Sequence, residues 1–174
     1  MAADRRYWDS NVFLGWLKAE ADKVAACQGV LDAAEAGTID IVTSALTLTE
    51  VIKMKGQQAI TRDKEEKIRG FFEQPYIIIR EVDRYVAEAA RELIWAHGVD
   101  PKDAIHLATA IRLHLPYLDT FDDKLIGLTG KLGIPKLTIG HPSVPHTPDM
   151  FPDTKQQITP KRRIRVRRSQ GKAN

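Results

Sequence analysis

The sequence predicts an α/β fold in which a parallel sheet of roughly five strands is flanked by helices. Short apolar and β-branched segments alternate along the chain with longer segments whose apolar residues recur at helical spacing. Hydrophobic residues make up 43% of the 174 residues, which is enough for the core of one domain with an attached segment. We expect the strands at residues 6–8, 39–43, 76–79, 117–120 and 137–139.

Glycine and serine mark the helix ends in the first half of the chain. Gly37 follows a helical segment and is a usual stop, because glycine adopts the left-handed conformation without a Cβ clash. Ser44 is expected to cap the next helix, which carries Glu50 and which we expect to end at Gly56. Over the whole chain, helices are predicted at residues 22–36, 44–56, 62–73, 82–95, 101–114 and 122–128.

Proline and glycine mark the helix ends in the second half. Gly98 ends one helix, and the next begins with Asp100 as its cap and Pro101 at the first helical position. Pro116 prevents that helix from continuing. The three tryptophans occur in apolar segments, so we expect all of them in the core: Trp8, Trp16 and Trp95.

The composition changes after Gly140, where we place the boundary between a domain of residues 1–140 and an extension of residues 141–174. Residues 141–152 contain four prolines and are expected to be extended. From Lys161 onward there are seven basic residues and no acidic ones, which leaves 19 basic against 23 acidic residues in the rest of the chain. This basic tail can bind nucleic-acid phosphates, as an edge strand or as a flexible arm, or it can serve only as a solubilising tail.

Cysteine content and hydropathy exclude several classes of protein. Cys27 is the only cysteine, so no disulfide within the chain and no cysteine-based zinc site is expected. No apolar run approaches the roughly 18 residues of a membrane helix, and the charged start MAADRRYW does not resemble a secretory signal. We therefore expect a protein of the cytoplasm.

Four acidic residues stand where predicted strands give way to helices, or early in a helix: Asp9, Glu50, Asp103 and Asp122. In an open parallel sheet, ligands bind beyond the carboxyl ends of the strands, so these side chains can converge from distant parts of the sequence. Converging carboxylates repel one another unless a cation joins them. Because Mg²⁺ and Mn²⁺ prefer oxygen ligands and promote phosphodiester hydrolysis, the pattern indicates a divalent metal site for that chemistry.

Each acid also has a purely structural interpretation. Asp9 and Asp122 can cap the helices that follow them. Asp103 can interact favourably with the positive end of the helix dipole, and Glu50 can be a solvated helix residue. His106, one turn after Asp103, can approach the site or can be a packed, hydrogen-bonded residue. Taken singly, the residues leave these alternatives open.

The four acids lie in short motifs that follow one another in a fixed order: Asp9 in DSNVFL, Glu50 in TLTEV, Asp103 in DAIHLATA and Asp122 in TFD. Each motif is weak alone, but four motifs in order are a fairly specific signal. Over residues 5–140 the chain resembles the PIN-domain nucleases, and more closely the VapC-type toxins of toxin–antitoxin pairs. The resemblance implies a Rossmann-like PIN domain with about five parallel strands and helices on both sides.

The resemblance also implies a role for each motif residue. The pocket for Mg²⁺ or Mn²⁺ would be formed by Asp9, Glu50, Asp103 and Asp122. Asn11 and Thr120 would support these acids through hydrogen bonds, and Asp123 would contribute through water. Asp119 precedes the last motif and is expected to face elsewhere. The first strand, RRYW, departs from the family pattern because it is shorter and more polar.

The function that the resemblance implies is that of a metal-dependent endoribonuclease, which cleaves RNA with water and is the toxin of a type II toxin–antitoxin system. The expected partners are the RNA substrate, an antitoxin protein that covers the acidic pocket, and a second copy of the chain in a homodimer. Two alternatives remain open. One is a non-toxin PIN nuclease of RNA processing or DNA repair, and the other is a nucleic-acid-binding protein with an inactive metal site.

Overall fold

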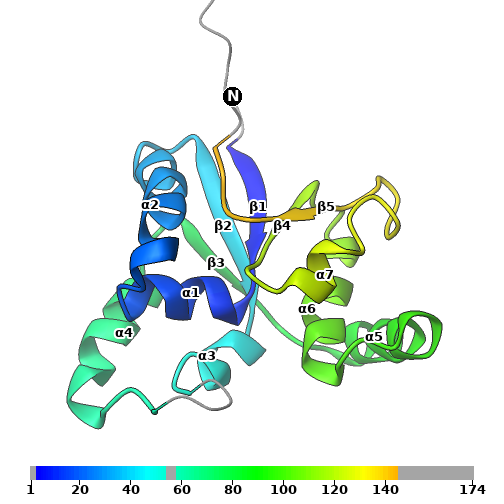
Figure 1. Ribbon diagram of the computed structural model, residues 1–174, viewed down its shortest axis with the longest axis horizontal. Coiled ribbons are helices and arrows are strands. Elements are labelled where there is room, and N and C mark those ends of the chain that lie inside the picture. The colour runs from blue at the N-terminus through cyan, green and yellow to red at the C-terminus, as the bar shows by residue number, and fades with distance from the viewer. Residues whose placement is uncertain (1–2, 54–57, 145–174) are drawn as a thin grey trace, which may run out of the picture. The chain divides into compact units, whose positions relative to one another are not determined.

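The computed structural model describes residues 3–53 and 58–144, which contain a five-stranded sheet (Figure 1). All neighbouring strands are parallel, in the order β3-β2-β1-β4-β5. The bounds are Asp4–Trp8 for β1, Ile39–Ser44 for β2, Ile77–Arg80 for β3, Tyr117–Asp119 for β4 and Thr138–Gly140 for β5. The predicted α/β fold with five parallel strands is confirmed.

Helices cover both faces of the sheet (Figure 1). α1, α2 and α4 lie on one face, and α5 and α6 lie on the other. The bounds of these helices are Ser10–Leu17, Ala21–Glu35, Glu65–Phe72, Arg84–His97 and Pro101–Arg112, in that order. The shorter elements are α3 (Leu46–Glu50), a 3-10 helix (Arg62–Lys64) and α7 (Asp123–Ile126). Within the described residues, no helix is long and apolar enough to cross a membrane.

β1 is the central strand, and its alternating side chains serve both halves of the core. Tyr7 packs into the cluster on the α6 face together with Leu107. Trp8 packs on the opposite face, where its ring meets that of Phe13 edge to face with centroids 5.2 Å apart. Because β1 is fixed on both faces, the residue that follows it, Asp9, starts from a rigid position.

Two predicted helix stops are confirmed at glycines that adopt the left-handed conformation. Gly37 follows α2 with φ of 74°, and Gly98 follows α5 with φ of 64°. The start of α5 differs slightly from the prediction, because Asp83 caps the helix and Arg84 is its first residue. The Asp83 carboxylate accepts the backbone N–H of Val86 at 2.7 Å.

The helix that carries Glu50 differs from the prediction at both ends. Ser44 is not its cap: it is the last residue of β2, and its hydroxyl lies 3.5 Å from Nδ1 of His106 in the buried interior. α3 ends at Glu50 because the chain turns at Val51, whose side chain is buried in the core. Gly56, the predicted end, lies outside the described residues.

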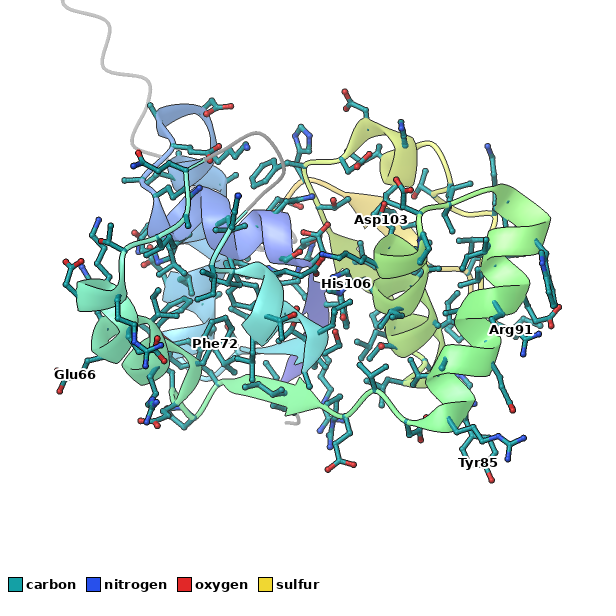
Figure 2. The ribbon with its side chains drawn as sticks, turned by 90° about the horizontal axis from the view of Figure 1, so that it is seen from below. Glu66, Phe72, Tyr85, Arg91, Asp103 and His106 are labelled. Carbon is teal, nitrogen blue, oxygen red and sulfur yellow. The ribbon has the colours of Figure 1, made fainter. Side chains whose placement is uncertain are left out.

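The prediction that all three tryptophans are core residues is wrong for one of them. Trp8 is buried and Trp16 is half-buried against the same cluster, but Trp95 is 68% exposed. The apolar stripe of α5 that contacts α6 includes Ala90 and Ile94. Successive side chains of a helix point about 100° apart around its axis, so the side chain after Ile94 points away from this stripe. Trp95 therefore lies outside the stripe, with the Arg91 guanidinium 4.9 Å from its ring centroid; Figure 2 shows Arg91 on the outer side of α5.

The last strand, β5, ends at Gly140, and the described residues end at Val144. The predicted features of the basic tail, as an edge strand or a flexible arm, lie outside the described residues. The domain boundary after residue 140 also stays a prediction.

Candidate active site

The strand order brings the carboxyl ends of β1 and β4 side by side where the winding of the chain reverses. The connection that leaves β1 crosses the sheet face with α1 and α2, whereas the one that leads into β4 crosses the face with α5 and α6 (Figure 1). Such a reversal leaves a crevice at the carboxyl edge of the sheet, where α/β proteins bind their ligands. Asp9 directly follows β1 and Asp122 lies shortly after β4, so both acids stand at this edge.

Asp9 is a buried helix cap whose charge is disfavoured. Its Oδ1 accepts the backbone N–H groups of Asn11 at 3.1 Å and Val12 at 3.2 Å, so the capping interpretation is correct. Burial, with a further contribution from the charge of Asp103, raises the pKa of Asp9 to about 7 in spite of these hydrogen bonds. A carboxylate with a raised pKa in a crevice is a candidate functional residue, because a bound cation would stabilise its charged form.

Asn11 joins the ends of β1 and β4. Its Nδ2 donates to Oδ2 of Asp9 at 2.9 Å and to Oγ1 of Thr120 at 3.0 Å, and its Oδ1 accepts the N–H of Phe121 at 2.9 Å. Thr120 Oγ1 also accepts the N–H of Asp122 at 3.0 Å. Asn11 and Thr120 therefore orient the segments that carry two of the acids.

Asp103 and Asp122 are electrostatic neighbours although they belong to different helices. Asp103 lies in the first turn of α6, where burial and then the charge of Asp122 raise its pKa. Asp122 caps α7, because its Oδ1 accepts the N–H groups of Lys124 at 2.7 Å and Leu125 at 3.4 Å. Asp123, the next residue, is exposed. Two acids that repel each other at this edge provide a reason for a cation to bind there.

Glu50 is held by three side chains from two other helices. Its Oε2 accepts the Ser10 hydroxyl at 2.9 Å and lies 2.8 Å from Nε2 of His106, while its Oε1 lies 3.1 Å from Nζ of Lys102. Burial alone would raise the pKa of Glu50, but the hydrogen bond and charge of His106, followed by the bonds from Ser10 and Lys102, lower it to about 2. Glu50 is therefore an ionised and oriented carboxylate, not a solvated helix residue.

His106 and Tyr7 form a buried connection to this carboxylate. His106 extends from α6, the helix that also carries Asp103 (Figure 2), and its Nδ1 lies 2.8 Å from the Tyr7 hydroxyl. His106 is thus both packed and directed at the site. The motifs do not indicate Tyr7, although the alternation along β1 places it on the α6 face. Ser10 and Lys102 carry no sequence signal for their contact with Glu50.

Asp119 faces away from the other acids, as expected. Its carboxylate accepts two hydrogen bonds from the Arg6 guanidinium, at 2.8 and 2.5 Å, and one from Trp8 Nε1 at 2.9 Å. Arg6 is only 4% exposed and also lies over the ring of Tyr117, 4.5 Å from its centroid. This buried pair explains why the first strand is more polar than the family pattern.

The four acids differ in their electrostatic state but share one type of donor atom. They offer only oxygen donors, and the pKa values of Asp9 and Asp103 are raised mainly by burial and further by neighbouring acids. In residues 3–53 and 58–144, no three His, Cys, Asp or Glu side chains are already grouped as a metal cluster. Mg²⁺ usually keeps several waters and takes one or two carboxylates directly, so the donor set fits such an ion.

The raised pKa of Asp9 predicts how stability depends on pH. Because the folded protein holds this proton more tightly than the unfolded chain, the free energy of unfolding in chelator should fall as pH rises from about 4 to about 7. Asp103 acts in the same direction, whereas the lowered pKa of Glu50 acts only below about pH 4.5. Asp9→Asn should remove on the order of 2–4 kcal/mol of this decline.

Denaturant titrations of wild type and Asp9→Asn at several pH values measure this difference. The asparagine variant loses the acceptor of the Asn11 Nδ2 bond, which shifts its stability by an amount that does not depend on pH. The prediction is therefore tested only by how the difference in unfolding free energy between wild type and Asp9→Asn changes with pH. Two parallel curves between pH 4 and 7 would show that Asp9 does not carry a raised pKa.

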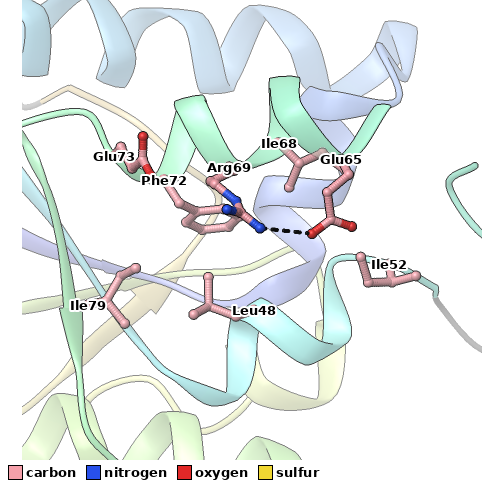
Figure 3. Close-up of a pocket in the computed structure, with 8 residues that line it drawn as sticks. All are labelled: Leu48, Ile52, Glu65, Ile68, Arg69, Phe72, Glu73 and Ile79. Carbon is pink, nitrogen blue, oxygen red and sulfur yellow. Dashed lines mark ion pairs between the residues drawn. The ribbon is translucent and has the colours of Figure 1, made fainter. Parts of the chain in front are cut away.

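A separate and mainly apolar pocket of about 440 Å³ lies between α3, α4 and β3 (Figure 3). Its apolar lining is Leu48, Ile52, Ile68, Phe72 and Ile79. Arg69 and Glu65, one turn apart on α4, form an ion pair of 3.7 Å beside the pocket. None of the four acids lines this pocket, so it is distinct from the acidic edge even though α3 contributes to both.

The fold and the acids define a class: parallel α/β proteins with an acidic site where the sheet winding reverses. The sequence matches the PIN domain family over residues 6–131, and the chain belongs to this family. PIN domains are typically metal-dependent nucleases. The fold is also similar to a chain of a toxin–antitoxin complex from Klebsiella pneumoniae, with a TM-score of 0.51 and 20% sequence identity over 71% of this chain and 92% of that chain. The comparison with curated proteins found no match.

Proposed function

We propose that this protein is a Mg²⁺- or Mn²⁺-dependent endoribonuclease that hydrolyses RNA phosphodiester bonds. The observation that carries the proposal is the electrostatic coupling of acids from separate segments: Asp9 with Asp103, and Asp103 with Asp122, at the edge where the sheet winding reverses. Glu50 approaches the same edge from α3 and is linked to α6 through His106. Membership of a family of nucleases gives this acidic edge its expected chemistry.

In this proposal the chain supplies the ligands and their orientation. The cation would be held by Asp9, Glu50, Asp103 and Asp122. Asn11 and Thr120 keep two of these acids in place through the bonds that join β1 and β4, and Asp123 is exposed and acts through water. When bound, Mg²⁺ or Mn²⁺ supplies polarisation of a phosphoryl oxygen and a water nucleophile near neutral pH.

Positive groups beside the acids favour a phosphate-containing substrate. A cavity of about 170 Å³ borders Asp103 and is also lined by Lys124. Lys102, at the start of α6, has a side chain that is 67% exposed next to Glu50. Both lysines can contact RNA phosphates near the acids, as Lys side chains commonly do.

The proposed biological role is that of a VapC-type toxin, kept inactive by an antitoxin protein and assembled as a homodimer. The ordered motifs support this role, and so does the shared fold with a chain of a toxin–antitoxin complex. An antitoxin that covers the acids would offer a positive group, such as an arginine, to the edge that otherwise binds a cation.

Cleavage of RNA by the purified full chain tests the proposal. With Mn²⁺ or Mg²⁺, we expect an RNA substrate to be cut into products with 5′-phosphate and 3′-hydroxyl ends, and we expect excess chelator to stop the reaction. Gel analysis with end-group labelling measures both. Cleavage that continues undiminished in chelator would contradict metal dependence. If expression harms the host and a co-expressed product of the adjacent gene relieves it, the toxin role is favoured over a non-toxin nuclease.

A further inference from the structure

A chain of buried hydrogen bonds runs from the central strand to Glu50. The backbone N–H of Ser44 donates to the Tyr7 hydroxyl oxygen at 3.1 Å, and that hydroxyl lies 2.8 Å from Nδ1 of His106. Nε2 of the same imidazole lies 2.8 Å from Oε2 of Glu50. Tyr7 is fully buried and His106 is 1% exposed, so water does not compete for the first two bonds.

The donors and acceptors along this chain follow one direction. Because the Tyr7 oxygen already accepts the N–H of Ser44, its own proton can go to Nδ1 of His106. When the imidazole is neutral and accepts at Nδ1, its proton lies on Nε2 and is donated to the carboxylate of Glu50; when the imidazole is protonated, Nε2 donates as well, so the bond to Glu50 forms in both states. These proton positions are assigned from the hydrogen-bond partners of each group. In this assignment Tyr7 favours, for the neutral imidazole, the tautomer of His106 that donates to Glu50.

The two oxygens of Glu50 have different partners. Oε2 is held by His106 and Ser10, which belong to packed helices. Oε1 has the Lys102 ammonium at 3.1 Å, on a side chain that is 67% exposed. Buried His106 and partly buried Ser10 thus fix the carboxylate from one side, while among the described residues its other oxygen meets a solvent-exposed ammonium that another cation can replace.

We infer that Tyr7 and His106 are positioning residues that hold Glu50 so that its Oε1 is available to a divalent cation. This inference rests on the proposed metal-dependent function. It assigns a role to two residues outside the four acids, and it explains why a series of hydrogen-bonded polar groups crosses the core. Such a chain is favourable only when every member is satisfied, and among the described residues no buried side-chain nitrogen or oxygen lacks a partner.

Binding of Mn²⁺ to the full chain, measured by electron paramagnetic resonance of the free ion, tests the inference without any activity assay. We expect His106→Leu to raise the Mn²⁺ Kd by about 10-fold or more, as observed for groups that orient metal ligands. His106→Gln should recover part of the affinity, because its amide can still donate to Glu50. Tyr7→Phe should have an intermediate effect, since it removes only the group that favours the donating tautomer of neutral His106.

Thr109→Val is the matched control. Thr109 lies on the same helix, is 1% exposed, and bonds only to the carbonyl of Ile105, at 2.7 Å. The Thr109→Val variant should be less stable than wild type in chelator, as measured by thermal unfolding, but should keep the wild-type Mn²⁺ Kd. If His106→Leu binds Mn²⁺ within twofold of wild type while Asp103→Asn does not bind it, the inference is wrong and the metal site stands. Where the leucine variant does not fold, His106→Gln and Tyr7→Phe take its place in this comparison. Equal binding by wild type and Asp103→Asn would overturn the proposed function together with the inference.

Discussion

Arg6→Met is expected to lower the free energy of unfolding by about 3–5 kcal/mol. The Arg6 guanidinium makes two hydrogen bonds to Asp119, and both side chains are almost fully buried between β1 and β4. Methionine has a similar length but no charge, so the substitution leaves the Asp119 carboxylate buried with Trp8 Nε1 as its remaining side-chain donor. The cost of an uncompensated buried charge dominates this effect. Denaturant titration measures it.

Two comparisons separate this mechanism from a general loss of charge. Arg5→Met changes the neighbouring residue, which is half-exposed and lies 3.6 Å from Asp40, and should cost about 1 kcal/mol or less. Adding Asp119→Leu to Arg6→Met removes the stranded charge and should recover part of the lost stability. Equal losses for the Arg5 and Arg6 variants would mean that the buried pair does not stabilise the fold.

Local sequence signals are sufficient to predict the fold and the edge where the acids lie. Alternating strand and helix periods indicate a parallel α/β sheet, and the positions of Asp9 and Asp122 just after strands place them at its carboxyl edge. Stops such as Gly98 depend on the conformation of a single residue, so they can be predicted without tertiary information. Asp9 and Asp122 act as caps and are also candidate ligands, and the second role is supported by the charge of Asp103 near Asp9 and by membership of the PIN family.

Contacts between distant segments could not be predicted in this way. The Arg6–Asp119 pair depends on the register of β1 against β4, in which Trp8 pairs with Asp119, and hydropathy patterns carry no information on register. The bond between His106 and Glu50 likewise requires the relative placement of α6 and α3. Trp95 shows a different kind of error: its apolar neighbours in the sequence predict a core residue, but it lies beside the buried stripe of α5 and is exposed.

Asp103→Asn is expected to reduce the rate of Mn²⁺-dependent RNA cleavage by at least about 100-fold. The variant keeps the shape of the side chain but removes one negative charge from the acids that would hold the cation. Polarisation by a bound cation contributes several kcal/mol to such reactions, and each 1.4 kcal/mol corresponds to roughly tenfold in rate. In chelator the variant should be at least as stable as wild type, because burial and the charge of Asp122 disfavour the Asp103 charge. Initial rates at saturating Mn²⁺ and unfolding in chelator measure the two effects.

Asp100→Asn provides the control at the same helix start. Asp100 precedes α6 as its cap residue, is exposed, and makes no capping hydrogen bond through its side chain. The Asp100→Asn variant removes one charge from the same region of the surface but none of the four proposed ligands. Its rate of RNA cleavage should therefore stay close to that of wild type. If Asp103→Asn loses both stability and activity, Asp103 has a structural role. If the variant loses activity alone, the charge of Asp103 is unfavourable in the folded protein until a cation binds. Equal cleavage by wild type and Asp103→Asn would remove Asp103 from the site.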